Sequence, residues 1–75
     1  MKKQTFIAYI VNENDIMIGF ERFSYKRLET VERSMKELFE SELYRICNKD
    51  AKAVKIYATP DGYNRENTPA LVFEV

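Results

Sequence analysis

The pattern of apolar and polar residues predicts a β-hairpin at the start of the chain. Residues 4–11 read Gln-Thr-Phe-Ile-Ala-Tyr-Ile-Val and are rich in β-branched and aromatic side chains, and the apolar character resumes over residues 16–23. The polar residues 12–15, Asn-Glu-Asn-Asp, separate the two stretches. Two such stretches joined by so short a polar connection are typical of paired antiparallel strands.

The spacing of apolar residues changes in the middle of the chain. A set of them recurs there at intervals of three and four: Leu28, Val31, Met35, Leu38, Phe39, Leu43 and Ile46. This spacing predicts an amphipathic helix. We expect Ser24 to cap its start, with Phe23 packed against Leu28, and the helix to end at residues 48–50. A continuous helix over this stretch would be about 35 Å long.

Two further strands are predicted over residues 53–59 and 70–75, with a polar loop between them. The chain therefore predicts a single small α+β domain over residues 1–75, in the order ββαββ. Its four-stranded sheet would be mainly antiparallel, with one long amphipathic helix packed on one face. A right-handed crossover through the helix gives the spatial strand order 2-1-3-4, and a mixed sheet with the second and third strands parallel is the alternative.

The hairpin also sorts side chains between the two faces of the sheet. A turn centred on residues 13–14 places three pairs on one side: Val11 with Ile16, Tyr9 with Ile18, and Ile7 with Phe20. We expect this side to face the helix, together with Val54 and Ile56 from the third strand. An open face then remains, and its apolar members would be Phe6, Ile10, Met17, Tyr57 and Val72. That face is more apolar than solvation requires.

Composition argues against catalysis. The chain has 75 residues with no histidine and one cysteine, Cys47, which the helical pattern places half-buried at the flank of the apolar stripe. Without histidine there is no Ser-His or Cys-His pair, and two glycines cannot build a phosphate-binding loop. Glu32 and Glu42 would stand about 15 Å apart along the helix, too far to act together on one glycosidic bond. We expect no enzyme, no cofactor and no metal site.

Charge, cysteine content and residue usage bear on where the protein works. Twelve basic and twelve acidic residues give a formal net charge of zero, which disfavours a strong overall attraction to nucleic acid or anionic lipid. A single cysteine, the lack of a signal-peptide pattern and the lack of a membrane-spanning run indicate a cytoplasmic protein. Abundant Phe, Tyr, Met, Ile, Asn and Lys, whose codons are A/T-rich, point to a low-GC bacterium or its phage.

The pattern therefore favours a non-catalytic protein-interaction or regulatory module, a homodimer or a partner of another protein, working through the open face. Tyr63 and Arg65, in the loop before the last strand, are candidate anchors because Tyr and Arg are enriched at binding hot spots. The alternative is a small nucleic-acid-binding module. It would use basic and aromatic residues at the helix start and before the third strand, namely Arg22, Tyr25, Lys26, Arg27, Lys52 and Lys55.

Overall fold

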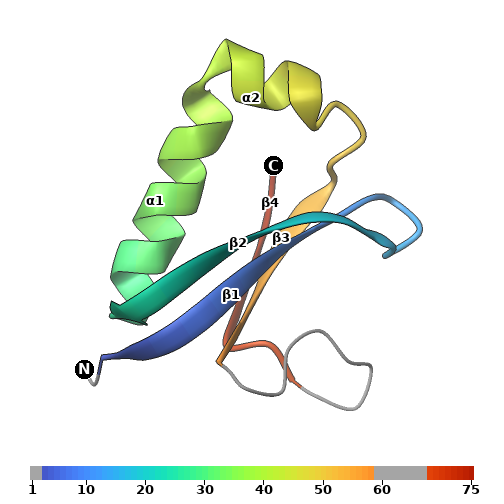
Figure 1. The fold of residues 1–75 in the computed structure, drawn as a ribbon. Coiled ribbons are helices and arrows are strands. Elements are labelled where there is room, and N and C mark those ends of the chain that lie inside the picture. Colours follow the sequence, from blue (N-terminus) through green and yellow to red (C-terminus); the bar gives the residue numbers. More distant parts are fainter. Residues whose placement is uncertain (1–2, 59–67) are drawn as a thin grey trace.

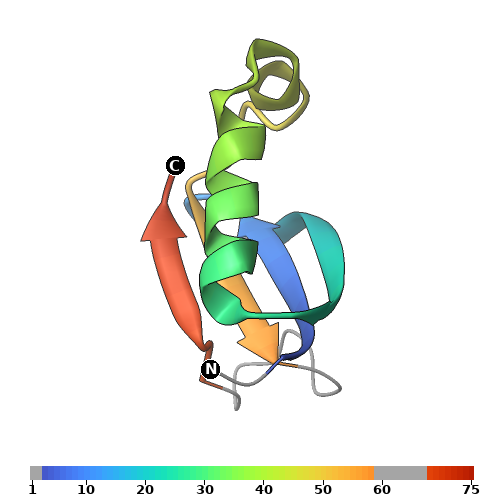
Figure 2. The same ribbon diagram turned by 90° about the vertical axis from the view of Figure 1, so that its left-hand side faces the viewer.

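The computed structural model describes residues 3–58 and 68–75. Its strands are β1 (Gln4–Val11), β2 (Met17–Lys26), β3 (Ala53–Ala58) and β4 (Leu71–Glu74). Its helices, between β2 and β3 in the chain, are α1 (Leu28–Glu40) and α2 (Glu42–Cys47). Figure 1 shows the two helices on the same side of the sheet, and Figure 2, turned by 90°, shows α1 lying across it. The predicted α+β fold is confirmed.

The four strands form one open, fully antiparallel sheet in the order β2-β1-β3-β4. This is the predicted order 2-1-3-4, and the alternative mixed sheet is wrong. The crossover through the helices carries the chain over β1, so that β3 pairs with β1 along residues 53–58. Pairing of the two central strands, β1 and β3, therefore joins the antiparallel pair β2-β1 to the antiparallel pair β3-β4.

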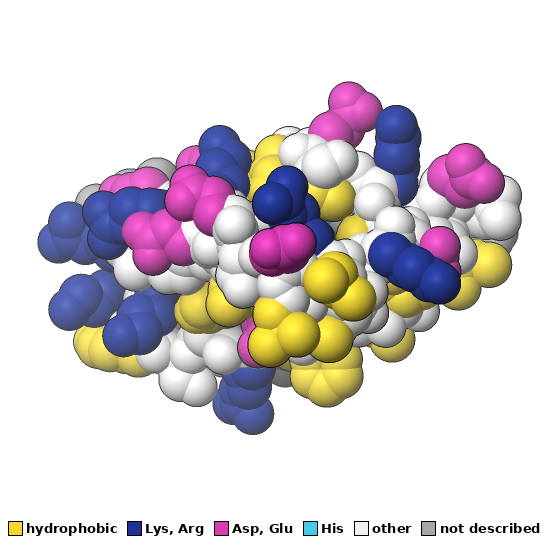
Figure 3. Space-filling view, turned by 90° about the horizontal axis from the view of Figure 1, so that it is seen from above, with side chains coloured by type: hydrophobic (Ala, Val, Ile, Leu, Met, Phe, Trp, Pro, Cys, Tyr) yellow, Lys and Arg dark blue, Asp and Glu magenta, His cyan; other side chains and the backbone are white. Residues whose placement is uncertain are grey.

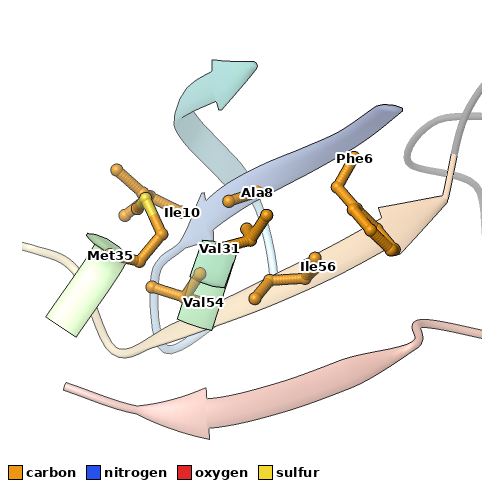
Figure 4. Close-up of a cluster of buried hydrophobic side chains, with 7 residues drawn as sticks. All are labelled: Phe6, Ala8, Ile10, Val31, Met35, Val54 and Ile56. Atoms are coloured by element: carbon orange, nitrogen blue, oxygen red, sulfur yellow. The ribbon is translucent and has the colours of Figure 1, made fainter. Parts of the chain in front are cut away.

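The predicted orientation of the first hairpin is wrong. The structure packs Phe6 (2% exposed), Ala8 (0%) and Ile10 (1%) under the helices, against Val31 and Met35 of α1 (Figure 4). Phe6 and Ile10 are thus core residues and are unavailable as interface residues. The side of β1 that carries Ile7 and Tyr9 faces away from the helices instead.

Pairing between β1 and β3 explains this reversal. Ile10 pairs with Val54, and Ala8 pairs with Ile56, so all four side chains lie on one face of the sheet. Val54 and Ile56 were correctly predicted to face the helix, and both are fully buried. Because the side chains of directly paired residues share a face, the helix-facing side of β3 fixes that of β1.

The hairpin register also differs from the prediction by two residues. Tyr9 pairs with Phe20 rather than with Ile18, and Ile7 pairs with Arg22. A shift of two residues keeps each side chain on the same side of the strand, so the predicted partition into two faces survives for the residues paired from Phe6–Phe23 to Ile10–Gly19. The irregularity after Ile10 changes it for Met17, which pairs with Val11 although it was predicted on the other side. Two irregularities interrupt the pairing, one near Val11 and one between Gln4 and Phe6.

The helical region is two helices rather than one long helix. Ser41 has an extended backbone (φ −73°, ψ 126°) that ends α1, and its hydroxyl accepts a hydrogen bond from the backbone N–H of Tyr44 at 3.5 Å. Ser41 therefore caps α2. The predicted cap is also wrong: Ser24 belongs to β2, and Arg27 stands at the N-cap of α1 without a side-chain hydrogen bond. The predicted end at Asn48 is confirmed.

Candidate interaction surface

The sheet face that points away from the helices is the candidate site, and we call it the outer face. The strand registers place these side chains on it: Ile7 and Tyr9 of β1, Phe20 and Arg22 of β2, Lys55 and Tyr57 of β3, and Val72 and Glu74 of β4. The paired residues Phe20, Tyr9, Lys55 and Val72 form a row across all four strands. In Figures 1 and 2, both helices lie on the opposite side of the sheet.

Three aromatic rings pack together on the outer face. The ring of Tyr9 lies 6.3 Å from that of Phe20 and 5.7 Å from that of Tyr57, measured between centroids. The Tyr9–Tyr57 pair is edge-to-face, at an interplanar angle of 74°. Tyr57 is buried, at 4% exposure, whereas Phe20 is 59% exposed and Val72 48% exposed. The exposed apolar area of this face therefore lies on its two edge strands.

An ion pair balances the charge at the centre of the outer face. Lys55 Nζ lies 2.6 Å from a carboxylate oxygen of Asp15, which belongs to the turn between β1 and β2. The side chain of Asn12 orders that turn by accepting hydrogen bonds from the backbone N–H groups of Asn14 (2.9 Å) and Ile16 (3.0 Å). Asp15 itself has a positive φ of 62°. The turn therefore holds the Asp15 carboxylate beside the ammonium of Lys55, which lies between Tyr9 and Val72 in the row.

The predicted interface residues divide into three groups. Tyr57 and Val72 lie on the outer face, and Met17, 43% exposed, pairs with Val11 at the end of the same face. Phe6 and Ile10 lie in the core. Tyr63 and Arg65 lie outside the described residues.

Phe20 and Tyr9 were not among the predicted interface residues, because the hairpin pattern placed them on the side under the helix. The signal that could have placed them was the pair of small residues, Ala8 and Gly19, on the opposite side of the hairpin. Small side chains let a helix come close to a sheet, and in the structure Asn48 of the α2 C-cap lies over Gly19. A Cβ built on that glycine would lie 3.6 Å from the amide oxygen.

The six residues of the predicted nucleic-acid site do not come together. Lys26 pairs with Gln4 at one end of β1, whereas the backbone N–H of Lys52 donates to the carbonyl of Val11 at the other end. Seven residues of strand separate Gln4 from Val11, or about 24 Å. Arg22, Tyr25 and Arg27 lie near the Lys26 end, while Lys55 is held by Asp15.

The carboxylates and the thiol considered for catalysis are held apart. Glu32 pairs with Lys36 one turn further along α1, at 2.9 Å, and Glu42 is exposed at the start of α2. Cys47 is exposed rather than half-buried, because the break at Ser41 turns α2 out of the direction of α1. Among residues 3–58 and 68–75, no group of three acidic or cysteine side chains could hold a metal ion.

A hollow that the sequence did not predict lies between the helices and β4. Its volume is about 480 Å³, and its apolar lining includes Phe39, Ala51, Phe73 and Val75. Lys36 also lines the hollow, and its ammonium stands 5.2 Å from the centre of the Phe73 ring. The cations Arg45 and Lys49 and the acids Glu40 and Glu74 also line it. This mixture gives the hollow no clear preference for a charged ligand.

In the part of the chain that the structure describes, no helix is long and apolar enough to cross a membrane. Compared with protein-family models, with curated proteins and with solved structures, the chain matches none.

Proposed function

We propose that the protein is a non-catalytic interaction module that associates with a second copy of itself through the outer face. The observation that carries the proposal is the exposure of Phe20 (59%) and Val72 (48%) on a sheet face that neither helix covers. Exposed apolar side chains on an uncovered face are typical of interaction surfaces. A chain of this size also gains stability by burying such a face against its copy.

The charges on the outer face favour a second copy over a strongly charged partner. Among the described residues of this face and its adjoining turn, Arg22 and Lys55 contribute two positive charges, and Glu74 and Asp15 contribute two negative ones. A face with balanced charge does not repel its own copy when the two are packed together.

The size of the outer face sets the expected strength of association. Four strands spaced about 4.8 Å apart, each contributing about seven residues, give a flat area of about 450 Å². A standard interface buries about 800 Å² on each partner. We therefore expect a dimer that dissociates on dilution, with the two sheets packed face to face about 10 Å apart.

The proposed location is the cytoplasm. Cys47 is exposed, and an exposed single thiol in an oxidising compartment would cross-link copies through intermolecular disulfides. A reducing compartment keeps this thiol free.

Sedimentation velocity over a range of protein concentrations tests the proposal. We expect the sedimentation coefficient to rise with concentration for the natural chain and to stay at the monomer value for Phe20→Glu. Leu43→Glu is the matched control, because Leu43 is 71% exposed on α2, on the other side of the sheet, and should associate as the natural chain does. A monomer at every concentration, or equal effects of the two substitutions, would contradict the proposal.

A further inference from the structure

Three exposed cations, Lys3, Lys26 and Arg27, lie where β2 meets α1. A fourth, Arg22, is exposed on the outer face four residues before Lys26, and we call the region that these four cations mark the basic end. The two ion pairs formed between described residues join other side chains, so none of these four is neutralised by an acid within 4 Å in the described part of the chain. Figure 3 shows several Lys and Arg side chains at the left-hand end of the molecule, with Asp and Glu side chains among them, on the side where Figure 1 places the start of α1.

Tyr25 stands in the middle of the basic end with an unusual backbone. Its φ is 55°, in the left-handed region that favours glycine, at the irregular pairing between Gln4–Lys26 and Phe6–Phe23. Its side chain is 71% exposed, and the ammonium of Lys3 lies 5.9 Å from the ring centre. A residue whose backbone is strained and whose ring leaves most of its surface in water does little for the stability of the fold. Its position suits contact with a ligand.

We propose that the basic end binds single-stranded nucleic acid, with an unpaired base stacked on Tyr25 and the neighbouring phosphates held by the four cations. Aromatic rings that accept bases, flanked by Lys and Arg that neutralise phosphates, are the parts from which sequence-tolerant single-strand sites are built. A paired base is already stacked within its helix, so a single exposed ring favours unpaired strands.

The charges around the basic end limit where the strand can run. Glu21, next to Arg22, pairs with the core residue Ala8 and accepts a hydrogen bond from Tyr44. Glu29 lies in the first turn of α1, two residues after Arg27, and further acids follow on the same helix at Glu37 and Glu40. A strand lying along α1 would meet these carboxylates. The favourable course therefore runs across the end of the sheet, from Arg22 towards Lys26 and Arg27.

Fluorescence anisotropy with a labelled 20-nucleotide single strand of mixed sequence tests the proposal. If four phosphates are neutralised, the affinity should fall by about 50-fold between 50 and 200 mM salt, because each contact contributes about −0.7 to the slope of log K against log salt for single strands. No binding at 50 mM salt, or binding that does not respond to salt, would overturn the proposal.

A pair of double variants tests the location. Lys26→Gln with Arg27→Gln should halve the salt slope, since two of the four contacts are removed. Lys49→Gln with Lys52→Gln removes the same charge from exposed positions at the opposite end of the sheet and should leave the slope unchanged. Equal effects of the two double variants would show that binding depends on overall charge and would overturn the assignment to the basic end.

Tyr25→Gly tests the stacking contact without the risk of unfolding, because glycine suits the positive φ at this position. We expect it to weaken binding of the single strand about 5-fold or more and to leave binding of the duplex form unchanged. Equal weakening for both forms would overturn the stacking role.

Binding to vesicles that contain phosphatidylserine tests the lipid alternative. If the protein binds these vesicles but not the oligonucleotide, and Tyr25→Gly does not change vesicle binding, the basic end would be a lipid site and the proposal would be overturned.

Discussion

The phenol of Tyr44 donates a hydrogen bond to the carboxylate of Glu21, at 3.2 Å, and so joins α2 to the edge strand β2. Asn48 supports the contact, because its side-chain amide donates to the carbonyl of Tyr44 at 3.0 Å. The ring of Tyr44 also meets that of Phe39 edge-to-face, with centroids 5.0 Å apart. Partial burial and the neighbouring charge of Glu21, together with the hydrogen bond, raise the pKa of Tyr44 to about 12.

This raised pKa predicts a loss of stability at alkaline pH. An unfolded tyrosine ionises near pH 10, so between about pH 10 and pH 12 the unfolded chain binds fewer protons at this residue than the folded chain does. The contribution of Tyr44 to stability should therefore be present in full and independent of pH below about pH 9, and it should fall as the pH rises from about 10 to 12. Urea unfolding from pH 8 to 11.5 measures the effect.

Tyr44→Phe should remove that component of the pH dependence. The difference in unfolding free energy between the natural chain and this variant should be constant up to about pH 9 and should shrink above it. Tyr25→Phe is the control, since Tyr25 is 71% exposed and its loss should leave the alkaline fall unchanged. A constant difference between the natural chain and Tyr44→Phe across the whole range would contradict the role given to Glu21.

Local patterns predicted the elements of this fold better than their arrangement. The alternating and three-to-four spacings gave β1 with its observed bounds and located the remaining strands within a few residues. The break at Ser41 was missed because the apolar spacing continues through it, from Phe39 to Leu43. A serine followed by Glu42 is a helix-start signal within that spacing, and the structure uses it.

The choice of covered face could not be read from the first hairpin alone. Both sides of β1 are apolar, so burial of either side satisfies the local pattern. The decision comes from the distant pairing of Ile10 with Val54, which is set by how β3 lies beside β1. The predicted nucleic-acid site failed for the same reason. Lys26 and Lys52 are both basic, but the strand pairing places them at opposite ends of the sheet.

A buried methionine, Met35, and an exposed one, Met17, should contribute differently to stability. Met35 is fully buried in the core between α1 and the sheet, so Met35→Ala should lower the unfolding free energy by about 2–5 kcal/mol. Met17→Ala, at a 43% exposed position, should cost less than about 1 kcal/mol. Urea unfolding of both variants at pH 7 makes the comparison. Similar losses for the two would mean that the helix does not cover the face occupied by Ile10.

The positive φ of Tyr25 predicts an unusual tolerance of glycine. A non-glycine residue in this region costs about 1 kcal/mol or more, and glycine removes that strain while adding flexibility to the unfolded chain. Tyr25→Gly should therefore leave the unfolding free energy within about 1 kcal/mol of the natural value or raise it. Ser24→Gly, one residue earlier in β2, relieves no positive φ and should destabilise by about 0.5–1 kcal/mol. Thermal unfolding followed by circular dichroism ranks the two, and a larger loss for Tyr25→Gly would contradict the strained geometry.

The ion pair between Asp15 and Lys55 predicts a salt-dependent effect on self-association. Asp15→Asn removes the carboxylate charge and keeps a residue that tolerates the positive φ of 62° at this position. The pair is partly exposed, with 56% of the Asp15 side chain in solvent, so its loss should lower the unfolding free energy by no more than about 1 kcal/mol. Lys55, in the row between Tyr9 and Val72, would then lose the Asp15 carboxylate, and the outer face of each copy would gain one net positive charge. Two copies packed face to face would therefore repel each other more strongly than two copies of the natural chain. We expect Asp15→Asn to weaken the dimer at 50 mM salt and to approach the natural chain at 1 M salt, where the screening length falls to about 3 Å. Sedimentation at both salt concentrations measures this, and a variant that dimerises as the natural chain does at 50 mM would show that Lys55 does not face the second copy.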